Sequence, residues 1–393
     1  MTASPLQKPP DFSLVLGGPL YQLFRRAHLS GSTLELLHRR VLVVSLLAWL
    51  PLAVLSTIQG HLFGGRNLTF LQDIESHVRL LVALPVLILA ELVVHRRTRA
   101  VVETFLERRI VTSEDTPKFY AAIEGAMRVR NSVPLELALL LFVYTVGHWT
   151  WRNQALLEAA SWYAVPEGRS LHLTLAGYWY SWVSVPIFQF ILIRWYLRLV
   201  IWFGLLWRTC RLNLRLVPTH PDRAGGIGFL GKSTYAFGPV LFAQGAVLAG
   251  LISNRIFYQG QSLMSFKVSI VALVGFFVLV ILGPLIMFTP RLAHTKRRGL
   301  REYGTLATDY VIDFDQKWVR GGARSEVILG TADIQSLSDL ANSYAVVREM
   351  KFVPFILDDV TRLVVATALP LSPLLLTIMR PEELVKHLIK VVF

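Results

Sequence analysis

Two arginines, Arg194 and Arg198, lie inside a long apolar stretch that runs from Leu171 to Asn213. Because they are four residues apart, both lie on one face of a helix. A guanidinium group binds anionic groups through several hydrogen-bond donors held in a fixed geometry. The pair therefore predicts a cationic pocket or ring on an anion path. The alternative is interfacial anchoring, since arginines beside tryptophans are typical of a membrane boundary.

A second set of candidate residues follows this stretch in a glycine-rich turn. Its members are His220, Asp222, Arg223, Gly225, Gly226 and Gly228. The first three supply a titratable ring, a carboxylate and a fork-shaped donor, and the glycines allow a tight turn or expose backbone N–H groups to an anion. We expect this turn to act as a gate at the membrane interface or to bind a lipid headgroup. The letters from Gly226 to Ser233 match a phosphate loop, but no β-strand is predicted before them, which argues against nucleotide binding.

Other polar groups in or beside the apolar runs carry weaker signals. Glu91 and Glu136 lie near the ends of such runs, where an ionisable group is less exceptional than at the bilayer centre. Asp309 and Asp313 share a helix face that could suit a divalent cation, but no calcium-loop pattern is present. Lys317 follows Asp313 at i,i+4 spacing, which indicates a solvated face. The sequence therefore predicts no metal site.

Catalytic motifs are not found in the sequence. It lacks the spaced patterns of metalloproteases and of nucleophile-elbow hydrolases. We therefore predict no catalytic residue and no cofactor, and the balance is against an enzyme. The single cysteine, Cys210, excludes an intramolecular disulfide and a cysteine metal site.

The composition is that of a membrane protein. Hydrophobic residues make up 53% of the 393 residues and charged residues only 17%, with a mean hydropathy of +0.49, whereas ordinary globular chains carry about 25% charged residues. The formal net charge of +14 would suggest nucleic acid in a soluble protein. Here the basic residues flank apolar runs, where they fix orientation. We therefore expect membrane lipids, and no nucleic acid, as partners.

Seven apolar runs are long enough to cross a bilayer, whose hydrocarbon core of about 30 Å needs ~20 helical residues. The predicted spans are Val41–Ile58, Val78–Val94, Leu135–Trp151, Leu171–Arg194, Tyr235–Asn254, Lys267–Phe288 and Arg362–Ile378. In the fourth, the helical pattern persists to Cys210. The sequence thus predicts an all-α polytopic integral membrane protein.

The distribution of Lys and Arg predicts the orientation. With the N-terminus inside, the inner segments hold 5, 8, 5 and 11 basic residues and the outer segments 1, 2, 2 and 3. The last inner segment is too long to count reliably, yet the remainder still favours this orientation by 18 to 8. We expect a bacterial inner (plasma) membrane protein with a cytoplasmic N-terminus.

The inner segments are predicted to be helical and amphipathic, because apolar residues recur in them at helical spacing. Residues 5–19 are instead expected to form a flexible or surface-lying tail. The predicted organisation is a cytoplasmic segment (1–40), a hairpin of spans one and two with basic helices (41–134), spans three and four (135–210), the glycine-rich turn (211–234), a hairpin of spans five and six (235–290), a cytoplasmic helical segment (291–361) and span seven with an amphipathic tail (362–393).

These features favour solute permeation, by an oligomeric channel or a transporter with a preference for anions. Arg194 and Arg198 would attract the anion, and the turn would gate the path. A membrane enzyme or lipid-headgroup-binding protein is the second hypothesis, based on the turn. A membrane scaffold or sensor with a cytoplasmic partner is the third. A homo-oligomer is expected.

Overall fold

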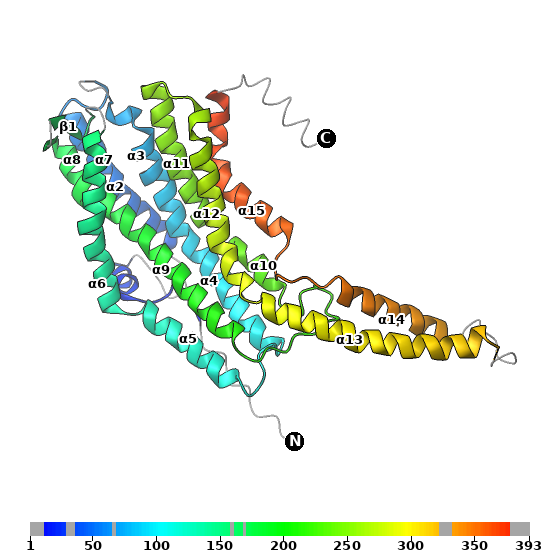
Figure 1. Ribbon diagram of the computed structural model, residues 1–393. Coiled ribbons are helices and arrows are strands. Elements are labelled where there is room, and N and C mark those ends of the chain that lie inside the picture. Colours follow the sequence, from blue (N-terminus) through cyan, green and yellow to red (C-terminus); the bar gives the residue numbers. More distant parts are fainter. Residues whose placement is uncertain are drawn as a thin grey trace.

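The apolar runs of the sequence form long helices in the computed structural model of the chain (Figure 1). The structure describes residues 12–28, 36–64, 68–157, 161–167, 170–321 and 332–377. Within these ranges, seven helices can span a membrane: Leu37–Ile58, Ile74–Glu107, Val133–Ala155, Leu175–Cys210, Phe229–Gln259, Leu263–Ile286 and Leu357–Thr377. The predicted number and order of the spans are confirmed, and the chain is an all-α polytopic membrane protein.

Local breaks divide several spans into shorter helices. The helices of the bundle are α2 (Leu37–Ile58), α3 (Ile74–Val78), α4 (Leu84–Glu107), α6 (Val133–Phe142), α7 (His148–Leu157), α8 (Leu175–Trp179), α9 (Val185–Cys210), α10 (Phe229–Ser233), α11 (Gly238–Gln259), α12 (Lys267–Ile286) and α15 (Leu357–Ala368). Turns of π-helix join α3 to α4, α6 to α7 and α8 to α9. Pro85 and Pro186 follow two of these turns, and each lacks the N–H that would continue the regular hydrogen-bond ladder.

The start of the fourth span differs from the prediction. The apolar run begins at Leu171, but the helix begins at Leu175, because the Thr174 hydroxyl accepts a hydrogen bond from the Gly177 N–H at 2.9 Å and caps the helix. The residues before this cap form strand β2 (Ser170–Leu173), which pairs antiparallel with β1 (Ala164–Glu167). This short hairpin was not predicted.

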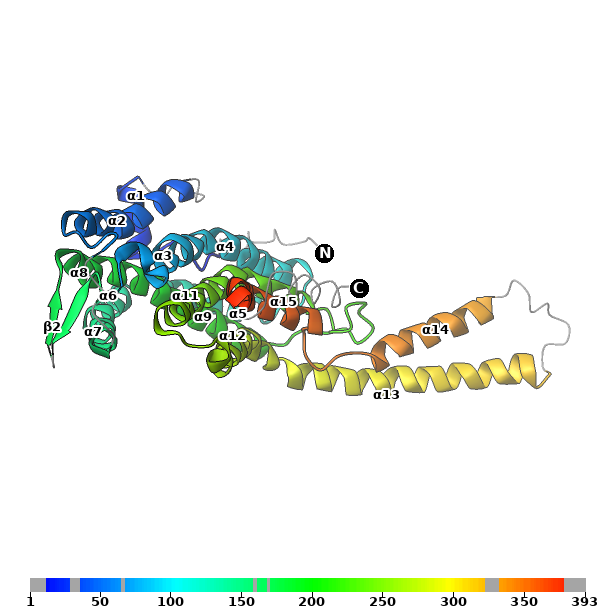
Figure 2. The same cartoon turned by 90° about the horizontal axis from the view of Figure 1, so that it is seen from above.

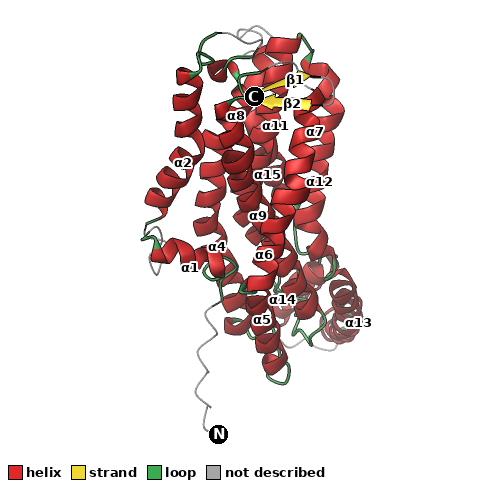
Figure 3. Cartoon of the chain, turned by 90° about the vertical axis from the view of Figure 1, so that its left-hand side faces the viewer, coloured by secondary structure: helices red, strands yellow, loops and turns green. Residues whose placement is uncertain are grey.

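Helices that do not span the membrane gather at one end of the bundle. They are α1 (Pro19–Arg26), α5 (Thr116–Arg130), α13 (Thr289–Phe314) and α14 (Ala332–Arg348). The helices α13 and α14 form an antiparallel pair that extends sideways from the bundle (Figure 2). Figure 3 shows α5, α13 and α14 at the end opposite β1 and β2. We call this the basic end, after the Lys and Arg residues of α13, and the other the hairpin end.

The segment before α1 was predicted to be a flexible or surface-lying tail. Its described part is instead buried, so this prediction is wrong there. Phe12, Leu14 and Val15 are almost fully buried at the basic end. The Phe12 ring lies 6.3 Å from the Trp202 ring of α9, and the Ser13 hydroxyl lies 2.8 Å from His95 Nδ1 of α4. The apolar side chains of this segment therefore fill a gap between the helices. The rest of the predicted tail, residues 5–11, lies outside the described residues, as does the predicted amphipathic tail over 378–393.

Helix α11 is the most enclosed of the spans and lies against α3, α4 and α15. The large side chains Trp162, Trp195 and Phe70 are completely buried around it and its neighbours. The Trp195 indole donates a hydrogen bond of 3.0 Å to the Leu87 carbonyl, which ties α9 to α4. The core thus fixes the relative positions of the helices that carry the polar sites.

Candidate functional site

The two predicted arginines of the fourth span face the interior of the bundle. Arg198 is 5% exposed, and its Nη2 lies 2.8 Å from Glu91 Oε1 on α4. Arg40 of α2 pairs with the other oxygen of the same carboxylate, and it is 2% exposed. The Arg198 guanidinium also stacks over the Trp195 ring at 4.6 Å. One carboxylate therefore holds two buried guanidinium groups and joins three helices, α2, α4 and α9.

Arg194 belongs to an adjoining ion pair. Its Nε lies 2.9 Å from Glu136 Oε1 on α6, and both side chains are largely buried. The second Glu136 oxygen accepts a hydrogen bond of 3.0 Å from the Leu20 N–H of α1. The N-terminal segment thus reaches this pair and covers it from the basic end.

Positive charge exceeds negative charge in this region. The group, which we call the arginine cluster, consists of Arg40, Arg130, Arg194, Arg198, Glu91 and Glu136. Its last cation, Arg130 at the end of α5, donates to the Ser13 carbonyl. Burial, with the nearby charge of Arg198, lowers the pKa of Arg130 to about 10. A small cavity of about 20 Å³ lies among Arg130, Glu136, Arg194 and Arg198, lined also by Leu14 and Gly17. The surplus of positive charge in the arginine cluster favours binding of an anion.

The glycine-rich turn follows α9, whose last residue, Cys210, lies about 18 Å along the helix axis from Arg198 at 1.5 Å per residue. The Asp222 carboxylate organises it. One oxygen accepts from the N–H groups of Ala224 (2.8 Å) and Gly226 (3.1 Å), and the other from Gly228 (2.8 Å). His220 Nδ1 lies 2.8 Å from the same carboxylate. The backbone donors that could have faced an anion are therefore bonded to Asp222.

The turn is also attached to the helices of the basic end. The Arg223 carbonyl accepts a hydrogen bond of 2.7 Å from the Lys351 N–H, and its guanidinium lies 2.9 Å from Glu349 just past α14. The Thr219 hydroxyl lies 3.4 Å from the Tyr303 hydroxyl of α13. Gly225 has a φ of +64°, which strains any other residue. A displacement of α13 and α14 would thus move the turn.

A pH-dependent effect is expected from Asp222. Burial raises its pKa, but the three N–H donors outweigh this, so the pKa is lowered. A lowered pKa stabilises the fold above the unfolded value of about 3.9, and this contribution is lost as the pH falls through the folded value. Asp222→Asn should therefore melt below the wild type at pH 7, with the gap closing at acidic pH. Thermal unfolding in detergent tests this. Asp309→Asn, an exposed change on α13, should leave no gap at either pH.

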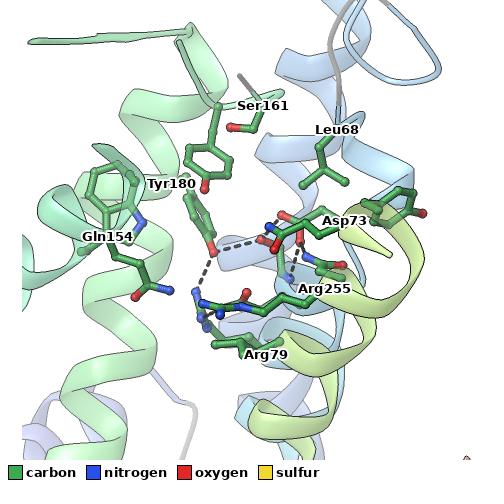
Figure 4. A pocket seen from close by; sticks show the side chains of 16 residues that line it. Leu68, Asp73, Arg79, Gln154, Ser161, Tyr180 and Arg255 are labelled. Carbon is green, nitrogen blue, oxygen red and sulfur yellow. Dashed lines mark hydrogen bonds and ion pairs between the residues drawn. The ribbon is translucent and has the colours of Figure 1, made fainter. Parts of the chain in front are cut away.

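A polar cavity that the sequence did not predict opens at the hairpin end (Figure 4). Its volume is about 130 Å³. The lining comes from α3, α7, α11, two π-helical turns and the loops before α3 and before β1. It consists of Leu68, Asp73, Glu75, Ser76, Arg79, Trp151, Gln154, Ala155, Ser161, Tyr163, Tyr180, Leu251, Asn254, Arg255, Tyr258 and Gln259. We call it the hairpin-end cavity.

Arg79 and Tyr180 form part of this cavity's wall. Arg79 Nη1 donates to the Tyr180 hydroxyl at 2.7 Å, and the Arg79 guanidinium also pairs with Glu75. Ser76 Oγ lies 2.9 Å from the same hydroxyl. Arg79 and Tyr180 each begin a π-helical turn, and such turns are frequent at functional sites. The irregular backbone thus brings two polar side chains of neighbouring spans into contact.

Sequence reasoning placed the arginines on a helix face but missed their partners and the hairpin-end cavity. The available signal was that Glu91 and Glu136 are ionisable residues in spans. Their partners could not be predicted, since Glu91 and Arg198, for example, are 107 residues apart in the chain. The roles of the residues in the glycine-rich turn stay predictions. No protein-family model matches the chain, and no curated protein and no solved structure matches it either.

Proposed function

We propose that the chain is a membrane carrier that moves a small anion. The observation that carries this proposal is the presence of buried guanidinium groups at two levels of one bundle. Arg79 lies at the hairpin-end cavity, and the arginine cluster lies nearer the basic end. Arginine inside a membrane is costly and marks ion or substrate pathways when it faces the bundle interior.

A carrier is favoured over an open channel because the two levels are separated by packed apolar side chains. Arg79 and Glu91 lie about 18 Å apart along the chain of α3 and α4, at 1.5 Å per residue. Between them, Leu80, Leu84 and Leu87 are completely buried. The residues Phe12–Val15 cover the arginine cluster from the other end. An anion would then need a conformational change to pass, which the π-helical turns beside Pro85 and Pro186 could allow.

The position of the arginines argues against a pore on an axis between copies of the chain. Arg194 and Arg198 are enclosed within the protomer by Glu136 and Glu91. In the proposed mechanism they attract the anion, and the glycine-rich turn transmits movements of α13 and α14 to the end of α9. The basic end faces the cytoplasm in this proposal, in line with the excess of Lys and Arg there. The homo-oligomer stays a prediction.

A sensor or scaffold is the second candidate, and the extended pair α13 and α14 favours it. Leu306, Val311, Ile312 and Val319 are exposed along α13 and the turn after it, where a soluble partner could bind. A protein with this role would carry no anion flux.

Reconstitution tests the carrier. Proteoliposomes should take up at least one of four radiolabelled anions, acetate, benzoate, phosphate or chloride, faster than empty vesicles do. The double variant Arg194→Gln/Arg198→Gln should reduce the rate at least tenfold, because the positive surplus of the arginine cluster is removed. Arg298→Gln, which removes an exposed cation on α13, should leave it unchanged. Absence of flux for every anion, or equal rates in the double variant and the wild type, would refute the proposal.

A further inference from the structure

We propose that the hairpin-end cavity binds a small organic carboxylate, held by Arg255 and Arg79 and enclosed by aromatic side chains. The proposal that this ligand is transported rests on the proposed carrier function. The proposal that it binds rests on the cavity alone.

The two carboxylates of the cavity already have partners. Asp73 accepts hydrogen bonds from the Ser76 N–H (3.1 Å), the Trp162 indole (2.9 Å) and the Asn254 amide (2.8 Å). Glu75 is paired with Arg79. The oxygens of both carboxylates are therefore occupied by hydrogen bonds. The four charged side chains of the lining sum to zero, but the one still open to a ligand carries a positive charge.

Arg255 supplies that charge. It extends from α11 into the cavity, and its side chain forms no hydrogen bond or ion pair with the residues that the structure describes. Figure 4 shows Arg255 and Arg79 reaching the space below the Tyr180 hydroxyl, with Gln154 on the facing wall. A half-buried guanidinium without a partner is costly. A carboxylate satisfies it with two parallel hydrogen bonds, for which the guanidinium fork is shaped.

The walls indicate that the anion is organic. Trp151, Tyr163, Tyr180 and Tyr258 line the cavity. The first three rings are in contact, with Tyr163 and Tyr180 at 5.4 Å between centroids and Trp151 and Tyr180 at 6.1 Å. Aromatic rings offer large apolar contact area and a polar tip. A bare inorganic anion would leave that area unused, whereas a ring or short chain beside the carboxylate would cover it. The volume of about 130 Å³ suits a ligand of this size.

Benzoate is the probe for this proposal. The full chain in detergent should bind benzoate, measured by titration calorimetry and by a rise in melting temperature, and should bind benzamide, its neutral counterpart, at least tenfold more weakly. Phosphate and chloride should also bind more weakly than benzoate. Equal binding of benzamide, or tighter binding of phosphate, would overturn the proposal.

Variants locate the site. Arg255→Gln should weaken benzoate binding at least tenfold, and Arg255→Lys less, since the charge is kept but the fork is lost. Arg152→Gln, at an exposed arginine of α7, is the matched control and should bind as the wild type does. Unchanged binding in Arg255→Gln, with an unchanged melting temperature of the free protein, would overturn the site. Arg194→Gln/Arg198→Gln should still bind benzoate; binding that depends on Arg255 without uptake would refute the carrier and leave this site standing.

Discussion

Replacing Glu91 with glutamine should destabilise the protein more than any other single change in the arginine cluster. The variant keeps the shape of the side chain but leaves Arg40 and Arg198 buried without a counter-charge. Breaking a buried ion pair in this way costs about 3–5 kcal/mol. The expected result is a lower melting temperature and less monodisperse protein in detergent, measured by size-exclusion chromatography after heating.

Two comparisons isolate the charge. Glu103→Gln changes a carboxylate on the same helix, α4, whose pair with Arg99 is exposed, so the expected loss is about 0–1 kcal/mol. The triple variant Arg40→Met/Glu91→Leu/Arg198→Met removes the whole group and should recover much of the lost stability, as apolar replacement of a buried ion group often does. If Glu91→Gln and Glu103→Gln melt at the same temperature, the Glu91 carboxylate does not compensate the charges of Arg40 and Arg198.

The spans could be predicted because their signal is local. Each consists of about twenty apolar residues with basic flanks, so the composition of one window decides it. The helices α5, α13 and α14 of the basic end could be predicted for the same reason, from apolar residues at helical spacing, whereas α1 was not predicted. The start of the fourth span could not, since Leu171 is apolar but lies in a strand of four residues, too short to give a pattern of its own.

The arginine cluster and the hairpin-end cavity depend on contacts between residues that are far apart in the sequence. A short stretch of sequence cannot show such contacts. Glu91 meets Arg40 across 51 residues and Arg198 across 107. The hairpin-end cavity joins Asp73 to Asn254 across 181 residues. In the sequence, Arg79 lies one residue inside the predicted span that begins at Val78. In the structure it begins a π-helical turn and lies in the wall of the hairpin-end cavity.

The contact between α11 and α15 depends on a glycine, and a large effect of an added methyl group is expected there. At Gly245, a Cβ atom would lie 1.9 Å from the Thr367 carbonyl oxygen and 3.0 Å from its carbon. The obstacle is backbone, so no side chain can rotate away and α15 must move. Helices in membranes associate largely through such close packing. The contact therefore depends on the absence of a side chain at Gly245.

Gly245→Ala should consequently lower the melting temperature in detergent, with a loss of about 1–3 kcal/mol or more for overpacking. Gly275→Ala is the matched control, since a Cβ there meets nothing within 4 Å. It should be neutral or stabilising by up to about 1 kcal/mol, because alanine favours a helix over glycine. A lower melting temperature for Gly245→Ala but not for Gly275→Ala is the result that close packing requires. Two equal shifts would mean that helix propensity, and not the contact with Thr367, governs both positions.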